Sequence, residues 1–434
     1  MLTPDENEVL TRVGPGTPMG NLLRRYWQPI AAATELTADR AKLRLTILGE
    51  ELVLFRDEAG EYGLVAEHCS HRGVSVYYGF LENGCIRCPY HGWMYDKEGN
   101  IVETPFEPAQ SLLKHTLKHT AYPVQKMAGF IWAYMGPQPA PLLPRWDILA
   151  WEQGTRRLEI RPVLNCNWLQ AEENTGDVTH TYFLHAYTMA SKGRADQGAG
   201  FGRPFYEYGF QPFKWGILKS WTYGGERGGS GWGNLLVFPN MLRLEGAMHW
   251  RVPIDDTHTK IMRVEWWPAG RAPRYGPPIE PTPPGQDPLV SYEASWVNTQ
   301  GEYHMDTFSS QDGMAWETQG PIFDRSREHL GASDTGIMLL REKLMDNVKR
   351  VQEGLEPDCL VREPAQNECI DLEGWLAERD YAAGTAGTIY DGVPKQRHPA
   401  EEVFDGRHQQ IEISSGPARL GVVEALAQAG HRAK

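Results

Sequence analysis

Two pairs of soft metal ligands, close together in the sequence, restrict the possible folds of this chain more than any other feature. Cys69 and His71 form a C-x-H pair, and Cys88 and His91 form a C-x2-H pair. Both pairs can reach one metal centre only if each lies on a turn. Residues suited to such turns are present at Gly73, Gly79, Gly84, Pro89 and Gly92. The segment 69–91 therefore predicts two short loops that hold one metal centre between them.

The type of metal centre follows from the donor atoms. Two thiolates and two neutral imidazoles are the ligand set of a Rieske 2Fe-2S cluster, in which both cysteines hold one iron and both histidines hold the other. A structural zinc ion also accepts this set, but zinc sites more often pair cysteine with cysteine and histidine with histidine. The residues that follow His91, Gly92-Trp93-x-Tyr95-Asp96, resemble the continuation of the cluster motif in Rieske oxygenases.

A second group of candidate metal ligands lies in the segment 164–187, which has the pattern of a helix. At about 100° per residue, one polar face of this helix would carry three of them: Glu173, Asp177 and His180. His185 would lie about 140° round from His180 on a regular helix. We therefore expect the helix to end, bend or bulge at 181–184, so that both imidazoles can reach one metal ion.

Two histidines and one carboxylate form the facial triad of non-haem ferrous oxygenases, which leaves coordination positions open for dioxygen. Taken alone, His180 and His185 would be better explained as ordinary helix histidines with local hydrogen bonds. Next to a Rieske motif, a shared metal site is the better interpretation. The residues themselves leave the carboxylate open among four candidates: Asp306, Asp312, Asp324 and Asp334.

The whole chain resembles the oxygenase (α) component of the Rieske non-haem iron oxygenases. Its segment 173–185 is similar to the iron motif of that family, E-N-x-x-D-x-x-H-x4-H. The resemblance implies that His180, His185 and Asp312 bind mononuclear ferrous iron, and that Asp177 bridges the iron site and the cluster. Three further segments resemble the phthalate dioxygenase-like branch, which includes aromatic-acid dihydroxylases and aryl-ether O-demethylases: 14–29, 251–259 and 319–334.

The resemblance implies an α+β fold in which an all-β Rieske domain precedes a catalytic domain with an antiparallel sheet covered by helices, of helix-grip type. Sequence patterns suggest four parts: an N-terminal helix and arm at 1–25, the Rieske domain at 26–145, the catalytic iron domain at 146–365 and a C-terminal extension at 366–434. The family further implies a separate reductase as electron donor, with or without a ferredoxin. It also implies a homotrimer or hexamer in which electrons cross a subunit interface.

The expected function is that of a terminal oxygenase in aromatic catabolism. It would use dioxygen and NAD(P)H-derived electrons to oxidise an aromatic carboxylate, by ring hydroxylation or by O-demethylation of an aryl methyl ether. One alternative is a Rieske monooxygenase acting on a non-acidic or alkaloid-like substrate. Less favoured are an electron-transfer Rieske protein and a zinc-stabilised binding protein. The candidates for substrate contact are four polar residues: Asn174, Arg243, Arg251 and His304.

Charge and composition limit the partners and the compartment. The net charge of −13 argues against nucleic acid or an anionic membrane as the main partner. No apolar run approaches the roughly twenty residues needed to span a bilayer, and the first residues lack the pattern of a signal peptide. Beyond Cys69 and Cys88, the remaining cysteines are scattered, as expected for reduced thiols. The sequence therefore predicts a cytoplasmic protein.

Overall fold

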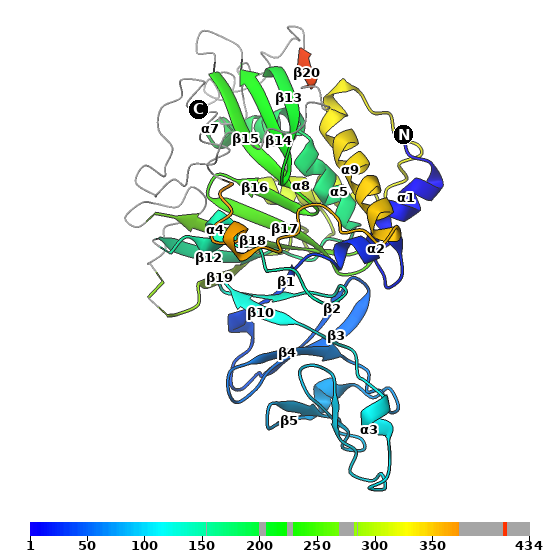
Figure 1. The fold of residues 1–434 in the computed structure, drawn as a ribbon. Helices are drawn as coiled ribbons and strands as arrows, with labels where there is room; N and C mark the ends of the chain where they lie inside the picture. Colours follow the sequence, from blue (N-terminus) through cyan, green and yellow to red (C-terminus); the bar gives the residue numbers. More distant parts are fainter. Residues whose placement is uncertain are drawn as a thin grey trace.

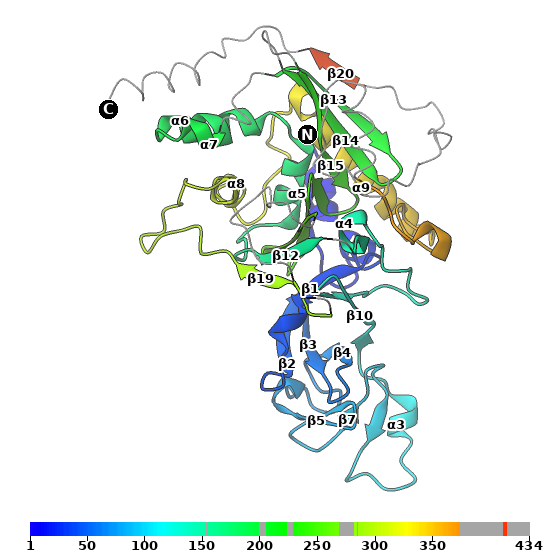
Figure 2. The ribbon, with the colours of Figure 1, turned by 90° about the vertical axis from the view of Figure 1, so that its left-hand side faces the viewer.

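The computed structural model describes residues 1–152, 154–198, 205–223, 229–268, 282–283, 285–372 and 411–414. These residues form two lobes, seen one above the other in Figure 1, and the turned view in Figure 2 keeps the same separation. Most of the predicted C-terminal extension, 366–434, lies outside the described residues. Among the described helices, none combines the length and the apolar character needed to cross a membrane.

Two short helices begin the chain, α1 (Pro4–Thr11) and α2 (Pro18–Leu23). Thr3 starts α1 with a capping box, in which its hydroxyl accepts the Glu6 backbone N–H and the Glu6 carboxylate accepts the Thr3 N–H. Both helices pack against α9 (Thr335–Gln352), so the N-terminal arm lies along the larger lobe (Figure 1).

The smaller lobe consists of short antiparallel strands, as the alternating apolar pattern predicts. One sheet has the order β1-β11-β10, with β1 (Gln28–Ala32), β11 (Phe130–Ala133) and β10 (Val124–Met127). The next has the order β2-β3-β4-β9, with β2 (Lys42–Ile47), β3 (Glu50–Arg56), β4 (Tyr62–Ala66) and β9 (Ala121–Tyr122). The third, farthest from the larger lobe, has the order β5-β6-β7-β8, with β5 (Phe80–Glu82), β6 (Cys85–Arg87), β7 (Met94–Tyr95) and β8 (Ile101–Glu103).

The larger lobe is built on one nine-stranded sheet with the order β19-β12-β18-β17-β16-β15-β14-β13-β20. Its strands are β12 (Thr155–Ile160), β13 (Phe205–Phe213), β14 (Gly216–Tyr223), β15 (Gly229–Val237), β16 (Met241–Leu244), β17 (Ala247–Pro253), β18 (Thr259–Trp267), β19 (Leu289–Tyr292) and β20 (Ile411–Ser414). The strands β13 to β18 follow one another as an antiparallel meander, in agreement with the expected antiparallel sheet. The sheet as a whole is mixed, because β19 runs parallel to its neighbour β12.

Helices cover both faces of this sheet. The short helix α4 (Asp147–Ala150) and the strand β1 pack on one face, next to the smaller lobe. The helix α5 (Trp168–Gly176) packs on the other face against β15, β16 and β17. The helix α9 packs against α5 and β14, and α8 (Phe308–Glu317) contacts the helical segment that follows α5. The expected α+β architecture is therefore confirmed.

Candidate metal centres

Two matching loops carry the four predicted cluster ligands at the far end of the smaller lobe. In each loop the cysteine N–H donates to a carbonyl five residues later, and the cysteine carbonyl accepts an N–H four residues later. That fourth residue is Gly73 in the first loop and Gly92 in the second, with φ angles of +72° and +73°. Glycine reaches this left-handed region without steric cost, which explains why both turns use it.

The two cysteines and the two histidines differ in solvent exposure, as expected for the ligands of a Rieske cluster. The side chains of Cys69 and Cys88 are buried, whereas His71 is exposed and His91 is partly exposed. The ring centroids of His71 and His91 are 4.6 Å apart. Thiolates inside and imidazoles outside fit a cluster with one inner and one outer iron. The four residues present therefore suit a 2Fe-2S cluster, and the histidine side of such a cluster would lie near the surface.

Two further residues of the cluster motif contact the ligands His71 and Cys69. The Trp93 ring stacks on His71 with 4.8 Å between centroids and an angle of 3° between planes. The Tyr95 hydroxyl lies 2.9 Å from the Cys69 Sγ atom, at the distance of a hydrogen bond. Contacts of this kind orient metal ligands and tune their electronic properties.

The segment expected to form one helix, 164–187, is divided into separate elements. The helix α5 ends at Gly176, and Asp177 has an extended backbone with φ −97° and ψ 134°. A π-helix, Thr181–Tyr187, follows, and then the short helices α6 (Thr188–Ser191) and α7 (Ala195–Gly198). The expectation of one helix is wrong, because the chain leaves the helical conformation before it reaches His180.

The π-helix explains how histidines five residues apart meet. Hydrogen bonds in a π-helix join residues i and i+5, so residues with this spacing lie on adjacent turns. His180 is the residue immediately before the π-helix and His185 lies within it, and their ring centroids are 5.3 Å apart. The expected irregularity between the two histidines is therefore present, in the form of a wider helical turn.

Glu173 does not share a polar face with Asp177 and His180, as the helical pattern suggested. Its carboxylate is buried and accepts hydrogen bonds from Arg325 and Arg341, at 2.6 to 2.8 Å. The reason is the end of α5 at Gly176, since the residues after it no longer continue the turn of the helix. Glu173 thus belongs to an ion-pair network and lies apart from the candidate metal ligands.

His180, His185 and Asp312 form a compact group, in which one ligand atom from each residue lies within 4.8 Å of the others. The Oδ1 atom of Asp312, on α8, is 3.4 Å from His185 Nε2 and 4.0 Å from His180 Nε2. Burial raises the pKa of the Asp312 carboxyl, but the nearby imidazoles outweigh burial and lower it. An ionised carboxylate facing two imidazoles fits the facial triad of ferrous iron.

The other ring nitrogen of each histidine faces a fixed acceptor. The Nδ1 atom of His180 lies 3.2 Å from Asp177 Oδ2, and that of His185 lies 2.9 Å from Gln311 Oε1. Such partners fix the ring so that Nε2 is directed at the metal.

Gln311 was not predicted from the sequence. The sequence feature that could have identified Gln311 is its position directly before Asp312, in the first half of α8.

Asp177 is held as a charged group beside His180. Its Oδ1 atom accepts hydrogen bonds from the backbone N–H and the hydroxyl of Thr179, at 2.7 and 3.0 Å. Burial would raise the pKa of this carboxyl, but His180 and the bonds from Thr179 outweigh burial and lower the pKa to about 2. Asn174 also approaches the site, with its Nδ2 atom 3.4 Å from His180 Nε2.

The two candidate arginines lie on opposite faces of the sheet. Arg243 on β16 pairs across the strands with Met248 on β17, and side chains alternate along a strand, so Arg251 points the other way. The buried Arg243 guanidinium binds the Asp147 carboxylate at 3.1 and 3.2 Å on the α4 face. Arg251 faces α5, where Glu172 is its neighbour. The position of Arg243 thus favours a structural ion pair over the substrate contact expected from the sequence.

His304 lies in the loop before α8, and its side chain is exposed. Its backbone N–H donates to the Trp296 carbonyl at 2.7 Å, which secures the loop and not the imidazole. The structure thus does not bring His304 into the group formed by His180, His185 and Asp312.

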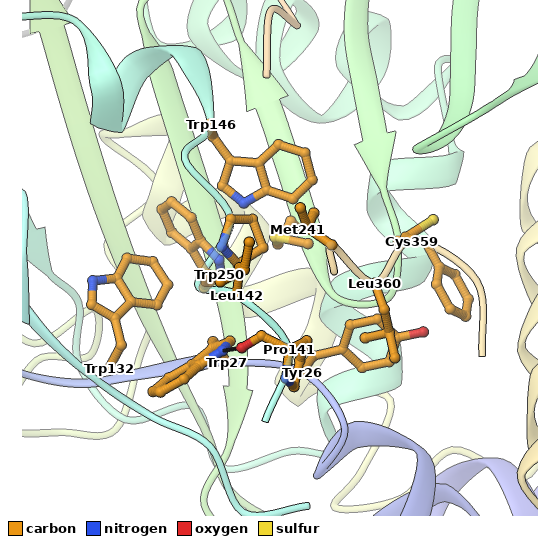
Figure 3. A pocket seen from close by; sticks show the side chains of 13 residues that line it. Tyr26, Trp27, Trp132, Pro141, Leu142, Trp146, Met241, Trp250, Cys359 and Leu360 are labelled. Atoms are coloured by element: carbon orange, nitrogen blue, oxygen red, sulfur yellow. Dashed lines mark hydrogen bonds between the residues drawn. The ribbon is translucent and has the colours of Figure 1, made fainter. Parts of the chain in front are cut away.

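A tryptophan-lined cavity lies on the α4 face of the sheet (Figure 3), and His180, His185 and Asp312 are not among the residues that line it. Its walls include the indoles of Trp27, Trp132, Trp146 and Trp250. The cavity measures about 20 Å³ and has room for about one water molecule. An aromatic substrate would not fit there, so this cavity is a feature of the core packing.

Two protein-family models match parts of this chain. The family model of the Rieske 2Fe-2S domain matches residues 26–122. A second family model, described as LigXa C-terminal domain like, matches residues 297–368, which include Asp312.

Relatives extend the similarity over most of the chain. The 5,5'-dehydrodivanillate O-demethylase oxygenase subunit of Sphingobium sp. (strain NBRC 103272 / SYK-6) is 36% identical over 408 residues, covering 88% of this chain and 91% of that protein. The phthalate 4,5-dioxygenase oxygenase subunit of Pseudomonas putida is 34% identical over 389 residues, covering 82% of this chain and 88% of that protein. Both alignments therefore span the two lobes.

A solved structure shares the fold. NdmA of Pseudomonas putida CBB5, determined with caffeine, matches with a TM-score of 0.55 at 18% identity, over 80% of this chain and 99% of that chain. At this level of identity the match concerns the arrangement of the two lobes alone.

Proposed function

Since this chain belongs to the Rieske non-haem iron oxygenases and is an oxygenase component of that family, we propose that it oxidises an aromatic carboxylate with dioxygen. The substrate is hydroxylated on the ring or loses a methyl group from an aryl ether. The two relatives described above act, by their names, on dehydrodivanillate and phthalate. The observation that carries the proposal in this chain is the buried cation Arg251.

Arg251 is suited to bind a substrate carboxylate. Its side chain is 2% exposed, and within the described residues its Nε and Nη1 atoms have no hydrogen-bond partner. The neighbouring carboxylate, Glu172 on α5, is 3.7 Å away at its nearest approach, which is longer than a charge-assisted hydrogen bond. Buried guanidinium nitrogens without hydrogen-bond partners are costly, and a bound carboxylate could accept a hydrogen bond from each of these two atoms.

The electrostatics around Arg251 favour an anion from outside the chain. Burial raises the pKa of Glu172 to about 8, despite the opposing effect of Arg251 and Lys219. Glu172 is therefore largely neutral at pH 7 and compensates little of the arginine charge. Arg251 faces α5, the helix that precedes Asp177 and His180, and the charge of Asp312 favours the charged form of its guanidinium.

Different residues of the chain have different roles: some bind the substrate, some hold the metals and some relay electrons. Cys69, His71, Cys88 and His91 hold the cluster, while His180, His185 and Asp312 hold the iron. When bound, the cluster and the iron supply single electrons and a site for dioxygen reduction, respectively. Arg251 fixes the acid group and so orients the ring or methoxy carbon towards that site.

We propose that electrons pass between subunits of a homotrimer or hexamer, after a separate reductase, with or without a ferredoxin, has reduced the cluster. The cluster loops and the iron ligands lie in different lobes of one chain (Figure 1). Exposed aromatic side chains surround the cluster end of the smaller lobe: Tyr78, Phe80, Tyr90 and Phe106. Near Asp177, Phe183 is also exposed. Asp177 would then join a cluster histidine of one subunit to His180 of the next.

The location of the protein in the cell and its division into domains are also proposed. The cytoplasm is the proposed location, and the division into 1–25, 26–145, 146–365 and 366–434 is the proposed domain organisation. Fractionation of the producing cells and limited proteolysis of the purified protein test them separately.

A paired comparison of substrates tests the role of Arg251. With a reductase, we expect oxygen uptake coupled to consumption of methoxybenzoates or phthalates, and little coupling with the matching amides. Arg251→Gln should raise the KM for the acid by roughly 10- to 100-fold, as expected for loss of a charge-assisted pair worth about 1.5–3 kcal/mol. Arg251→Lys should recover part of the loss, because it keeps the charge.

Equal coupling of acids and amides in the wild-type protein would contradict the acid specificity. An unchanged KM for the acid in Arg251→Gln, with normal iron and cluster contents, would contradict the role of Arg251 while leaving the oxygenase function intact.

A further inference from the structure

His119, which is not part of the cluster motif, lies buried behind the first cluster loop. Its side chain is 2% exposed and precedes β9 in the chain. The Nε2 atom lies 2.9 Å from the Ala66 carbonyl, and the Nδ1 atom lies 2.7 Å from the Ser70 hydroxyl. Because a carbonyl can only accept, Nε2 carries the proton, and Nδ1 then accepts the hydrogen bond from Ser70.

Two connections join this imidazole to the cysteine at the start of the loop. Ser70 stands between the ligands Cys69 and His71, so its bond to His119 fixes the backbone of the loop. The His119 ring also stacks on Tyr95, with 4.1 Å between centroids and an angle of 21° between planes. Tyr95 in turn places its hydroxyl 2.9 Å from Cys69 Sγ. The imidazole thus contacts both groups that position the sulfur atom.

We propose that His119 is a positioning residue that raises the reduction potential of the cluster by holding Tyr95 and Ser70 against the Cys69 loop. A hydrogen bond to a ligand sulfur stabilises the reduced cluster, which carries more negative charge, and therefore raises the potential. The hydrogen bond from Tyr95 depends on the position of the phenol ring, and His119 covers one face of that ring. Reduction adds one electron to the cluster and breaks no bond, and the electron comes from the reductase or, in a redox titration, from the added chemical reductant. The inference depends on the cluster alone, whatever the substrate.

Redox titration of the purified, cluster-loaded protein tests this inference. His119→Gln keeps a polar side chain but loses the stacked ring, and His119→Phe keeps a ring but loses both hydrogen bonds. Each should lower the equilibrium constant for one-electron reduction by roughly three- to tenfold, which corresponds to roughly 28–59 mV. His115→Gln is the matched control, because His115 is exposed four residues earlier, and it should leave the potential unchanged.

The double variant His119→Gln/Tyr95→Phe shows whether His119 acts through Tyr95. Residues that act through one contact give non-additive effects. We therefore expect His119→Gln to shift the potential less in the Tyr95→Phe background than in the wild type. Unchanged potentials in both His119 variants would overturn the inference, as would fully additive shifts. If those variants lose the cluster, Ser70→Ala breaks the same hydrogen bond from the other side, and an unchanged potential there would also overturn it.

Discussion

Asp177 is the residue proposed to connect the two metal centres, and its carboxylate is held beside His180. One of its oxygen atoms is fixed by Thr179, and the other lies 3.2 Å from the Nδ1 atom of His180. Its low pKa keeps the charge present throughout the neutral range, because the carboxyl titrates near pH 2. The carboxylate can therefore accept a hydrogen bond from the His180 imidazole without itself taking up a proton.

Replacement of this carboxylate should separate metal binding from turnover. In Asp177→Ala, we expect normal iron and acid-labile sulfide contents and a turnover rate lowered by about 10- to 100-fold, because the ligands remain but the connecting group is lost. Thr179→Val is the control, since it removes only one of the bonds to Asp177. Normal single-turnover and steady-state rates in Asp177→Ala would contradict the role of this residue as the bridge.

The residues most readily predicted were those whose chemistry admits few alternatives. Cysteine and histidine at short spacings point to a metal, and the structure brings His180, His185 and Asp312 together. Arg243 and Arg251 show the limit of this reasoning. Both interrupt apolar strands, and only the pairing of β16 with β17 reveals that they face opposite sides of the sheet. Gln311 escaped prediction because an amide has no distinctive pattern in a sequence.

At the scale of elements, the break after α5 depends on a partner far away in the sequence. A Cβ atom added to Gly176 would lie 3.0 Å from the Gly336 carbonyl carbon and oxygen, so α5 ends where it comes closest to the start of α9. The H-x4-H spacing alone showed that a regular helix cannot serve both histidines. It could not show that the solution would be a π-helix, because residue type does not encode the i to i+5 hydrogen-bond pattern.

The two cluster loops make a matched pair for a stability measurement. In Gly73→Ala the new Cβ meets no atom within 4 Å, so only the left-handed backbone is penalised, by about 1–2 kcal/mol. In Gly92→Ala the Cβ would in addition lie 3.2 Å from Pro105 Cγ. We expect urea unfolding to show a loss of stability for both variants and a larger loss for Gly92→Ala, with lower cluster content. Two neutral substitutions, or the reverse order, would show that the loops do not depend on these φ angles.

At the scale of the molecule, the predicted cluster ligands and the predicted iron ligands belong to different lobes of one chain, and Figure 2 shows these two lobes. If electrons cross between subunits, two defective chains should complement one another. Cys88→Ala removes a cluster ligand, and His185→Ala removes an iron ligand. Each variant alone should be inactive, and the co-expressed mixture should regain part of the wild-type turnover.

The complementation experiment can also contradict electron transfer between subunits. A mixed oligomer that contains both metal centres but remains inactive would mean that each iron receives electrons only from the cluster of its own chain. Light scattering on the same sample gives the number of subunits and so checks the proposed trimer or hexamer.

The most direct measurement is a single turnover of the anaerobically reduced protein with aromatic acids, exposed to ¹⁸O₂ and followed by mass spectrometry and a formaldehyde assay. The account predicts an oxidised acid in the wild-type protein and none in His185→Ala. Ring dihydroxylation would leave two labelled oxygen atoms in the product, whereas O-demethylation would remove a CH₂ unit and release formaldehyde. A protein with intact cluster and iron that reacts with dioxygen but leaves every acid unchanged would contradict the central claim.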